Sequence, residues 1–420
     1  MAKTLEGIKV VLLATFIAAP AAARYLTDYG AEVIWIESDK GDALRHTGPQ
    51  EGRIKSVIEN TTVEYLHGNQ KCVSLNVKTP EGMDALHRML AKADVFVTNW
   101  RFGALERAGL SYDILKEKYP TLIYAMALGY GLTGPDRDLP GYDFTAFWGR
   151  GGYTNNLSKR GESPITMIPA LGDNNAGLVL ALGIMTALLK RTKTGKGDLV
   201  TASLYETAIW NQSIMLMGVQ YDGQAHEYPI RFIDNKNPLN NAYVSSDARV
   251  IQIAMPDYDV RVEHFLEVIG RHDLFETGKF WPQTKMVEIE SYPELIESIK
   301  EWFAGYTKDE IADIFVKGDI PFSVAYNWDE IMNDPQANAI GAFYDCEMAN
   351  GVVKKVTHTP VRLASEMDLP TRRAPWIGEN TEEVLKDLGY SDDEIKAMFE
   401  SGAAYTWDPS IELGDMKPVN

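Results

Sequence analysis

The sequence predicts an α/β fold, because short strand-like runs and longer helix-like segments alternate along most of the chain. The short runs are rich in Val, Ile and Leu, whereas the longer segments repeat their apolar residues at helical spacing. At 420 residues the chain exceeds what one hydrophobic core usually serves, so two lobes are expected. Its 45% hydrophobic and 24% charged residues are typical of a globular protein with a large core.

The N-terminal segment predicts a βαβ unit. A buried strand is expected over Val10 to Leu13, and a second over Val33 to Ile36. Between them, the run from Ala21 to Tyr29 predicts a helix that ends at Gly30. The apolar start of the chain has features of a signal peptide, but we interpret it as a strand and a helix separated by a loop with Pro20.

Strands and helices continue to alternate up to about residue 217. Further strands are expected over Cys72–Val77, Val95–Thr98, Leu122–Ala127 and Leu199–Ser203. Further helices are expected over Glu81–Ala91, Tyr112–Lys118, Leu178–Leu189 and Glu206–Met217. Glycine and proline are dense between Gly129 and Gly152, which predicts loops that approach a ligand, with an ordinary surface connection as the alternative.

The sequence changes character near Gln220, where a polar, turn-rich passage is typical of a linker between domains. A smaller lobe is expected to follow, with strands near Val250–Ala254 and Phe322–Ala325 and helices over Val260–Ile269, Tyr292–Phe303 and Lys308–Phe315. The C-terminal part predicts a strand at Val361–Leu363 and helices over Thr381–Asp387 and Asp392–Phe399.

Charge and cysteine content limit the partners and the compartment. The formal net charge is -18, and no long stretch clusters Lys and Arg as a nucleic-acid or anionic-membrane surface requires. No apolar stretch reaches the roughly 20 residues of a membrane-spanning helix. Cys72 and Cys346 are too few for a disulfide framework, and the seven histidines show no zinc-site spacing. We therefore expect a metal-free, cytoplasmic protein that binds neither nucleic acid nor membrane.

The loop after the first strand argues against a dinucleotide cofactor. Glu37 closes the second strand, at a place where an acidic residue often binds a ribose hydroxyl. However, the loop from Ala14 to Pro20 contains no glycine, so its backbone is not expected to approach a pyrophosphate. An NAD-dependent enzyme is therefore disfavoured.

One acidic side chain, Asp173, stands between Gly172 and a long apolar run that predicts a buried helix. A carboxylate at such a turn lies near outward-pointing helix N–H groups, and the glycine allows a ligand to approach the backbone. Asp173 is therefore a candidate nucleophile that needs no partner base. The alternative is that Asp173 only caps the helix, and the local sequence alone favours this alternative.

Short stretches matching one enzyme family occur in order along nearly the whole chain. They include Gly30–Ile34 with Glu37 and Gly41-Asp42, Lys71 with Ser74–Lys78, Ala93–Val95 with Asn99–Arg101, Gly172-Asp173, Thr194–Gly197, Ile320-Pro321, Asp334–Gln336, and Ala374-Pro375 to Leu388-Gly389. In order and spacing they resemble the family III CoA-transferases, also called the formyl-CoA or carnitine CoA-transferase family. The segments Phe16–Pro20 and Pro140–Ala146 are most similar to the clostridial (R)-2-hydroxy-acid CoA-transferases, which act on phenyllactate or 2-hydroxyisocaproate.

The resemblance implies that Asp173 attacks the thioester carbonyl of an acyl-CoA and then carries CoA as an aspartyl thioester. Coenzyme A would be a co-substrate rather than a permanent cofactor. It would move from an enoyl- or aryl-acyl-CoA to a small carboxylic acid, an (R)-2-hydroxy acid, as in amino-acid fermentation. The family positions that lie near the nucleotide of CoA correspond to Lys71, Asn99, Trp100, Arg101 and Arg107. Candidates for contacts with the substrate or with a developing oxyanion are Gly172, Asn174 and Tyr142.

The resemblance also implies an interlocked homodimer. A Rossmann-like large domain would comprise residues 1–219 and, after a second linker, the C-terminal part of 331–420. Residues 220–330 would form the first linker and a smaller α+β domain. An acyl-CoA racemase of the same superfamily and a non-catalytic CoA-binding protein stay open as alternatives. Such racemases use a histidine in a Gly-His-Asp segment, where this chain has Gly141-Tyr142-Asp143. Because a phenol is a poor acid–base group near neutral pH, the transferase is preferred.

Overall fold

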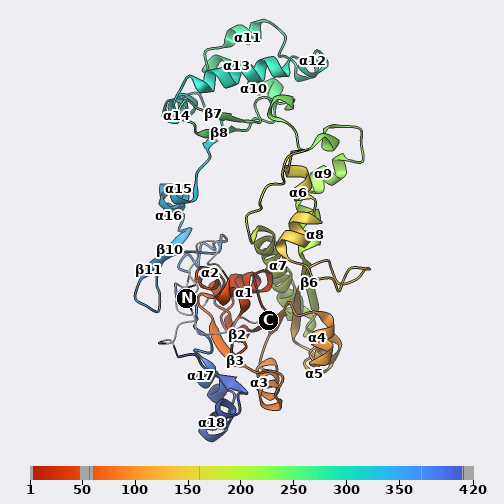
Figure 1. Cartoon of the computed structure of the whole chain (residues 1–420), viewed down its shortest axis with the longest axis vertical. Helices are drawn as coiled ribbons and strands as arrows, with labels where there is room; N and C mark the ends of the chain where they lie inside the picture. The colour runs from red at the N-terminus through yellow and green to blue at the C-terminus, as the bar shows by residue number, and fades with distance from the viewer. Residues whose placement is uncertain are drawn as a thin grey trace. The chain divides into compact units, whose positions relative to one another are not determined.

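The computed structural model describes residues 3–47, 56, 60–159, 161–369, 371–408 and 410. The chain divides into two compact units, each described here by itself (Figure 1). The large unit comprises Met1–Asn155, Pro164–Gln220 and Ala339–Asn420. The small unit comprises Asn156–Ser163 and Tyr221–Asn338.

A seven-stranded sheet forms the centre of the large unit, and its strand order is β12-β3-β2-β1-β4-β5-β6. Its strands are β1 (Lys9–Leu13), β2 (Glu32–Glu37), β3 (Lys71–Leu75), β4 (Val95–Thr98), β5 (Ile123–Leu128), β6 (Leu199–Ser203) and β12 (Ala404–Tyr405). All neighbouring pairs are parallel except β12 with β3. The order 3-2-1-4-5-6 is that of a doubly wound sheet, and it reverses between β1 and β4. The predicted α/β class is therefore confirmed.

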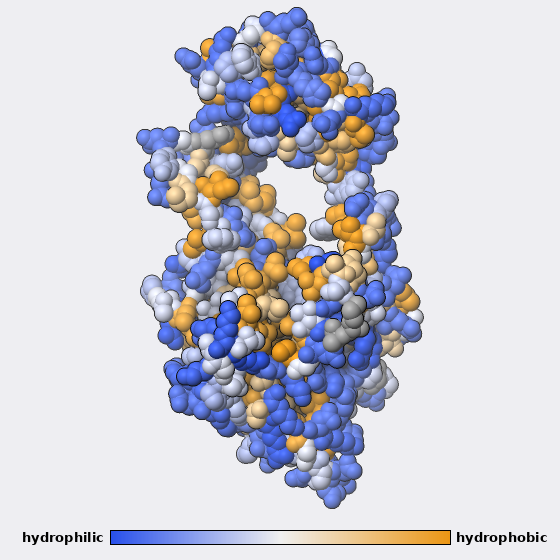
Figure 2. All heavy atoms as spheres, turned by 180° about the vertical axis from the view of Figure 1, so that it is seen from behind, coloured by the Kyte–Doolittle hydropathy of each residue, from blue (hydrophilic) through white to orange (hydrophobic). Residues whose placement is uncertain are grey.

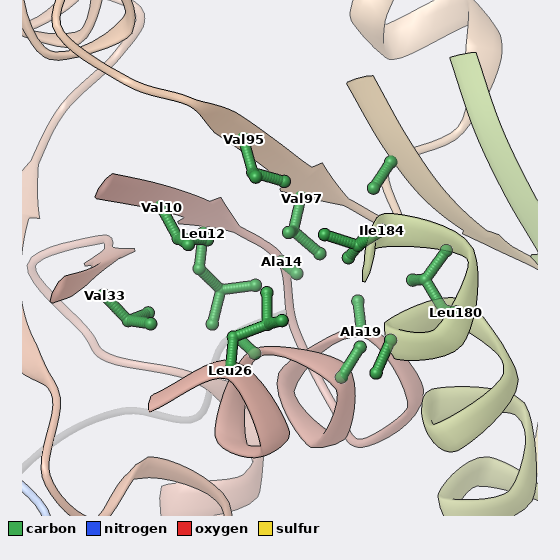
Figure 3. Close-up of a cluster of buried hydrophobic side chains, with 14 of the residues drawn as sticks. Val10, Leu12, Ala14, Ala19, Leu26, Val33, Val95, Val97, Leu180 and Ile184 are labelled. Carbon is green, nitrogen blue, oxygen red and sulfur yellow. The ribbon is translucent and has the colours of Figure 1, made fainter. Parts of the chain in front are cut away.

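Alternate residues of the central strands enter two different cores, because successive strand side chains point to opposite faces. Val10 and Leu12 of β1 belong to one core, with residues of α1 (Ala18–Asp28) and α7 (Leu171–Thr194). Figure 3 shows these side chains gathered with Leu26 of α1 and Ile184 of α7. Val11 and Leu13 face the second core, on the other side of the sheet. This buried arrangement fixes the carboxyl ends of the strands, where the candidate site lies.

Shorter helices complete the large unit. They are η1 (Ala43–His46), α2 (Thr61–His67), α3 (Pro80–Leu90), α4 (Phe102–Arg107), α5 (Tyr112–Lys118), η3 (Asp143–Gly149), α8 (Leu204–Asn211), α9 (Ser213–Gly218), α17 (Thr381–Asp387) and α18 (Asp392–Glu400), while α6 (Tyr153–Leu157) crosses the boundary between the units. The long helix α7 extends well beyond the predicted Leu178–Leu189 at both ends. Its early start places Asp173 inside the first helical turn.

One predicted strand is wrong, and one hairpin was not predicted. Val361–Leu363 forms no strand, because only Leu363 takes part in an isolated bridge, to Glu366. An antiparallel hairpin instead joins β10 (Phe343–Glu347) to β11 (Val353–Thr357). Most of β11 is exposed and carries two lysines, so it lacks the buried apolar pattern on which the strand predictions relied.

The small unit has an antiparallel three-stranded sheet, β7 (Ala242–Val244), β8 (Val250–Ile253) and β9 (Phe322–Val324). Its helices are η4 (Gln224–Glu227), η5 (Phe232–Asp234), α10 (Tyr258–Val268), α11 (His272–Glu276), α12 (Gln283–Glu288), α13 (Tyr292–Ala304), α14 (Lys308–Lys317) and α15 (Trp328–Asn333), and α16 (Pro335–Ala339) ends at the boundary. A separate core includes the stacked rings of Tyr243 and Phe303, with centroids 4.8 Å apart. None of the predicted site residues lies in this unit.

By length and composition, α7 qualifies as a candidate membrane span. Of its apolar window, 44% is buried within the structure. Across the described residues it is the one helix that passes this test. Such a single match is weak support for a membrane span.

Candidate active site

A cavity of about 840 Å³ opens in the large unit at the carboxyl ends of β1, β4 and β5. Its lining includes Thr15 after β1, Asn99 after β4, and Gly129 after β5. Ligands commonly bind at the point where the strand order of a doubly wound sheet reverses, and this cavity lies there. The cavity brings together six of the nine residues proposed from the sequence, namely Asp173, Asn99, Trp100, Arg101, Arg107 and Tyr142.

Asp173 is the third residue of α7, so it lies within the helix rather than at its cap. The N-cap position belongs to Ala170, which has a left-handed φ of 68° and provides no side-chain cap. The capping contact comes instead from Asp143, whose Oδ1 accepts the N–H of Gly172 at 2.8 Å. The simple capping alternative for Asp173 is therefore wrong.

Burial and, as the smaller cause, the nearby charge of Asp143 together raise the pKa of Asp173 to about 7. Burial also raises the pKa of Asp143, although its hydrogen bond from the Gly172 N–H opposes this. A group with a pKa near 7 is only about half ionised at neutral pH. The candidate nucleophile is therefore only partly ionised at neutral pH in the free site.

Gly172 lies at a point of very close packing. A Cβ atom there would lie 2.2 Å from Cγ of Phe147 and 2.4 Å from Oδ1 of Asp143. Because its N–H is donated to Asp143, Gly172 has no free N–H to offer a developing oxyanion. The expected oxyanion contact therefore does not fit this arrangement. Asn174 is half-buried in the same helical turn and does not line the cavity.

Lys71 also lies outside the cavity. It is the first residue of β3, and the cavity forms at the carboxyl ends of parallel strands, the opposite end of the sheet. Its Nζ lies 2.7 Å from Glu383 and 3.5 Å from Glu32. In this structure Lys71 therefore forms ion pairs with two glutamates outside the cavity.

Asn99 contacts the neighbouring loop with both polar atoms of its amide. Its Oδ1 accepts the N–H of Thr15 at 3.1 Å, and its Nδ2 donates to the carbonyl oxygen of Thr15 at 2.6 Å. These bonds fasten the loop after β1 to the loop after β4. Asn99 thus acts on the shape of the cavity in addition to lining it.

Comparison with known proteins identifies the family. Residues 5–381 match the family model described as CoA-transferase family III. The chain belongs to CoA-transferase family III. The CoA-transferase is 43% identical over 394 residues to the cinnamoyl-CoA:phenyllactate CoA-transferase of Clostridium sporogenes, covering 94% of this chain and 95% of that protein. It is 38% identical over 397 residues to the (R)-2-hydroxy-4-methylpentanoate CoA-transferase of Clostridioides difficile, covering 94% and 98%.

A solved structure agrees with this assignment. A CAIB/BAIF family protein from Brucella suis matches with a TM-score of 0.77 at 25% identity, over 92% of this chain and 100% of that one. The family resemblance stated from the sequence is therefore confirmed, as is the expectation that the protein is an enzyme. Its activity class is CoA transfer.

Several residues lining the cavity of this CoA-transferase were not singled out from the sequence. The guanidinium of Arg137 lies 4.3 Å from the ring centroid of Phe102. The ring of Phe16 meets that of Tyr142 edge to face, with centroids 5.5 Å apart. Arg137 lies within the glycine- and proline-rich stretch that predicted ligand loops, so the region but not the residue was predictable.

The described residues contain no group of three or more His, Cys, Asp or Glu side chains placed to hold a metal ion. What the cavity offers is one carboxylate at the start of α7, exposed arginines at both ends of α4, and aromatic rings. This set suits a nucleophilic carboxylate beside a phosphate-bearing, partly apolar ligand.

Proposed function

We propose that this enzyme moves CoA from an acyl-CoA to a carboxylic acid through covalent intermediates on Asp173. The observation that carries the proposal is the place of Asp173, a half-buried carboxylate that lines the large cavity beside arginines and aromatic rings. A nucleophile must be desolvated yet reachable, and this position provides both conditions.

In the first half-reaction, ionised Asp173 attacks the thioester carbonyl carbon. The C–S bond breaks, CoA leaves as a thiolate, and a mixed anhydride remains. The thiolate then attacks the aspartyl carbonyl carbon, which releases the donor acid as a carboxylate and leaves an aspartyl-CoA thioester. The acceptor carboxylate then attacks the aspartyl-CoA thioester and releases CoA thiolate, which leaves a second mixed anhydride. The thiolate attacks the acceptor's carbonyl carbon in this anhydride, which forms the new acyl-CoA and regenerates the Asp173 carboxylate. No external base is needed, because each nucleophile is an anion.

The CoA moiety is proposed to bind along α4. Arg101 and Arg107 are exposed cations that line the cavity, as phosphate binding requires. Trp100 and Phe102 provide aromatic surface for the adenine, and Arg137 adds a cation beside Phe102. Lys71 is left out of this site because it lies at the other end of the sheet.

For the acyl group we propose an enoyl- or aryl-acyl-CoA donor and an (R)-2-hydroxy acid acceptor. Two relatives with at least 38% identity carry names with phenyllactate or (R)-2-hydroxy-4-methylpentanoate as the acid. The lining near Asp173 is consistent with such bulky apolar groups, since it includes Phe16, Ile17, Leu139 and Tyr142. Against the racemase alternative, no histidine is found among the described residues that line the cavity.

The working form is proposed to be a homodimer, interlocked as in the family resemblance, in the cytoplasm. The large unit exposes apolar side chains along one stripe of α7, at Leu178, Leu182, Met185 and Leu189. Helices α8 and α9 add Trp210 and Ile214, which are 76% and 85% exposed. Hydrophobic patches also interrupt the hydrophilic surface in Figure 2. Apolar surface of this extent is typical of a subunit interface.

The test is covalent trapping with a panel of acyl-CoA donors, followed by hydroxylamine treatment and peptide mass spectrometry. We expect hydroxamate on the peptide with Asp173 and none on the peptide with Asp138, another aspartate of the same cavity. Asp173→Ala should lose both the adduct and turnover, whereas Asp113→Asn, on the exposed face of α5, should retain both. Turnover that survives in Asp173→Ala would refute the nucleophile, and CoA binding without transfer by any donor would favour a binding protein.

A further inference from the structure

The loop that joins β1 to α1 contains an unusual backbone conformation beside the proposed nucleophile. Phe16 has a φ of 61°, in the left-handed region that side chains other than Gly, Asn and Asp rarely adopt. Thr15 and Phe16 both line the cavity that contains Asp173. Such a conformation persists only when neighbouring groups hold it in place.

Two side chains from other parts of the chain bind the backbone of this loop, one at Thr15 and the other at Phe16. Asn99 binds the N–H and the carbonyl oxygen of Thr15. Asp42, at the N-cap of η1, accepts the N–H of Phe16 through Oδ2 at 3.1 Å and the N–H of Leu44 through Oδ1 at 2.8 Å. Asp42 is only 3% exposed and does not itself line the cavity.

Asp42 is in turn fixed by a buried ion pair. Its backbone N–H donates to Oε1 of Glu37 at 2.6 Å, and Oε2 of Glu37 lies 2.8 Å from Nη2 of Arg45. The guanidinium of Arg45 also lies over the ring of Trp35, at 4.9 Å from its centroid. Glu37, considered above as a ribose contact in a dinucleotide site, therefore stabilises the position of Asp42 and, through Asp42, the loop.

The held backbone sets the position of one aromatic ring. With Phe16 fixed in this turn, its ring packs edge to face on Tyr142. Tyr142 directly precedes Asp143, which binds the first turn of α7 through Gly172. The loop after β1 and the start of α7 are thus connected through neighbouring contacts around the cavity.

We propose that Asp42 is a positioning residue, which holds the Phe16 turn and so sets the acyl-binding shape of the cavity beside Asp173. The effect on turnover rests on the proposed function, whereas the effect on the loop does not. Glu37 from β2 and Arg45 from η1 are the charged groups that face Asp42. Burial raises the pKa of Asp42 to about 7, so the strength of the hold is expected to depend on pH in this range.

The test uses Asp42→Asn, which keeps the size of the side chain but replaces one of its two acceptor oxygens by a donor. The amide keeps one acceptor oxygen and turns the other position into a donor, so only one of the two short bonds, to Leu44 at 2.8 Å or to Phe16 at 3.1 Å, keeps its geometry. Asp42→Ser, with a single short acceptor that suits an N-cap, is the second variant. Asp334→Asn is the matched control, since Asp334 also accepts two backbone N–H groups, from Gln336 and Ala337, away from the cavity.

Amide hydrogen exchange gives the readout that does not depend on activity. Both Asp42 variants should exchange the peptide covering residues 14–18 about tenfold faster, with β1 and α7 protected as before. Asp334→Asn should leave this peptide unchanged. Unchanged exchange in the Asp42 variants, or faster exchange throughout the large unit, would overturn the positioning role.

Steady-state kinetics adds the functional readout. With a bulky aromatic acyl-CoA, kcat/KM of Asp42→Asn should fall about tenfold, while the Kd of free CoA stays within about twofold, because the CoA-binding side chains are untouched. A parallel loss of CoA affinity would contradict a local effect on the acyl site. If the wild type transfers CoA to no acid, the proposed function fails, and hydrogen exchange still decides whether Asp42 holds the turn.

Discussion

Asp143 and Asp173 act together at the N-terminal end of α7. Asp143 accepts the Gly172 N–H at 2.8 Å and so makes the kind of capping contact that the local sequence suggested for Asp173. Asp173 is left inside the first turn, where burial and then the charge of Asp143 raise its pKa to about 7. One carboxylate thus stabilises the helix end while the other faces the cavity.

Replacing Asp143 by Asn tests this electrostatic coupling. The amide oxygen still accepts the Gly172 N–H, but the negative charge that raises the pKa of Asp173 is gone. Because the proposed nucleophile is the ionised carboxylate, the rate should rise with pH through the pKa of Asp173. We expect the acid limb of the kcat/KM profile, near pH 7 in the wild type, to move to lower pH. If the acid limb does not move, it reports the titration of a group other than Asp173.

Asp173→Asn should stabilise the protein at alkaline pH. The pKa of Asp173 is about 7 in the folded state against an ordinary value of 3.8, so folding favours the protonated form. That stabilisation is complete below about pH 4 and is lost as the pH rises to about 7. Above pH 7 the wild type contains a partly buried charge that Asn lacks. We expect a gain of roughly 2 kcal/mol at pH 8 and almost none at pH 4, measured by denaturant unfolding. Asp113→Asn, at an exposed site, should show no such pH dependence.

Arg107→Ala and Lys71→Ala form a matched pair for the CoA site. Arg107 lines the cavity, whereas Lys71 lies at the opposite end of the sheet in ion pairs with Glu383 and Glu32. Removing one phosphate contact should raise the KM for acyl-CoA about tenfold in Arg107→Ala, with little change in kcat. Lys71→Ala should leave both constants within about twofold. An equal effect of the two substitutions would place the CoA site elsewhere.

Gly172→Ala tests the close packing beside the proposed nucleophile. The added methyl would lie 2.2 Å from Cγ of Phe147, a ring that is almost fully buried. We expect a loss of about 2 kcal/mol or more in the free energy of unfolding, together with loss of transfer. Gly223→Ala, where a Cβ meets no atom within 4 Å, is the control and should be nearly neutral. Wild-type stability in Gly172→Ala would contradict the packing.

Ile214→Glu tests the proposed dimer. Ile214 of α9 is 85% exposed in the single chain, and α9 contacts α8, which in turn contacts α7. A charge buried in an apolar interface is costly, so sedimentation velocity should detect monomer, or a dimer that dissociates at micromolar concentration. Lys300→Glu, on the exposed side of α13, should leave the wild-type state unchanged. A wild-type monomer would refute the homodimer outright.

The sequence predicted the six parallel strands of the large unit, because buried parallel strands leave continuous apolar runs. The predicted run Val10–Leu13 lies within β1, and Val95–Thr98 coincides with β4. The β10–β11 hairpin left no such run, since most of β11 faces solvent. Helix α7 extends beyond the predicted Leu178–Leu189 because its first residues, from Leu171, and its last, up to Thr194, are mostly polar or glycine and lack the apolar pattern.

By itself, the sequence predicted the α/β class and the family, and it singled out Asp173 as a candidate nucleophile, since these follow from local patterns and ordered motifs. Only the tertiary structure decided which candidates share one cavity. Parallel strands bring their carboxyl ends together, so Asn99 and Asp173 meet there while Lys71, at the amino end of β3, does not. The roles of Asp143 and Asp42 were likewise hidden, because each binds a backbone N–H more than 20 residues away in the chain. Hydrogen bonds of this kind have no local sequence signature, since they depend on how distant segments pack.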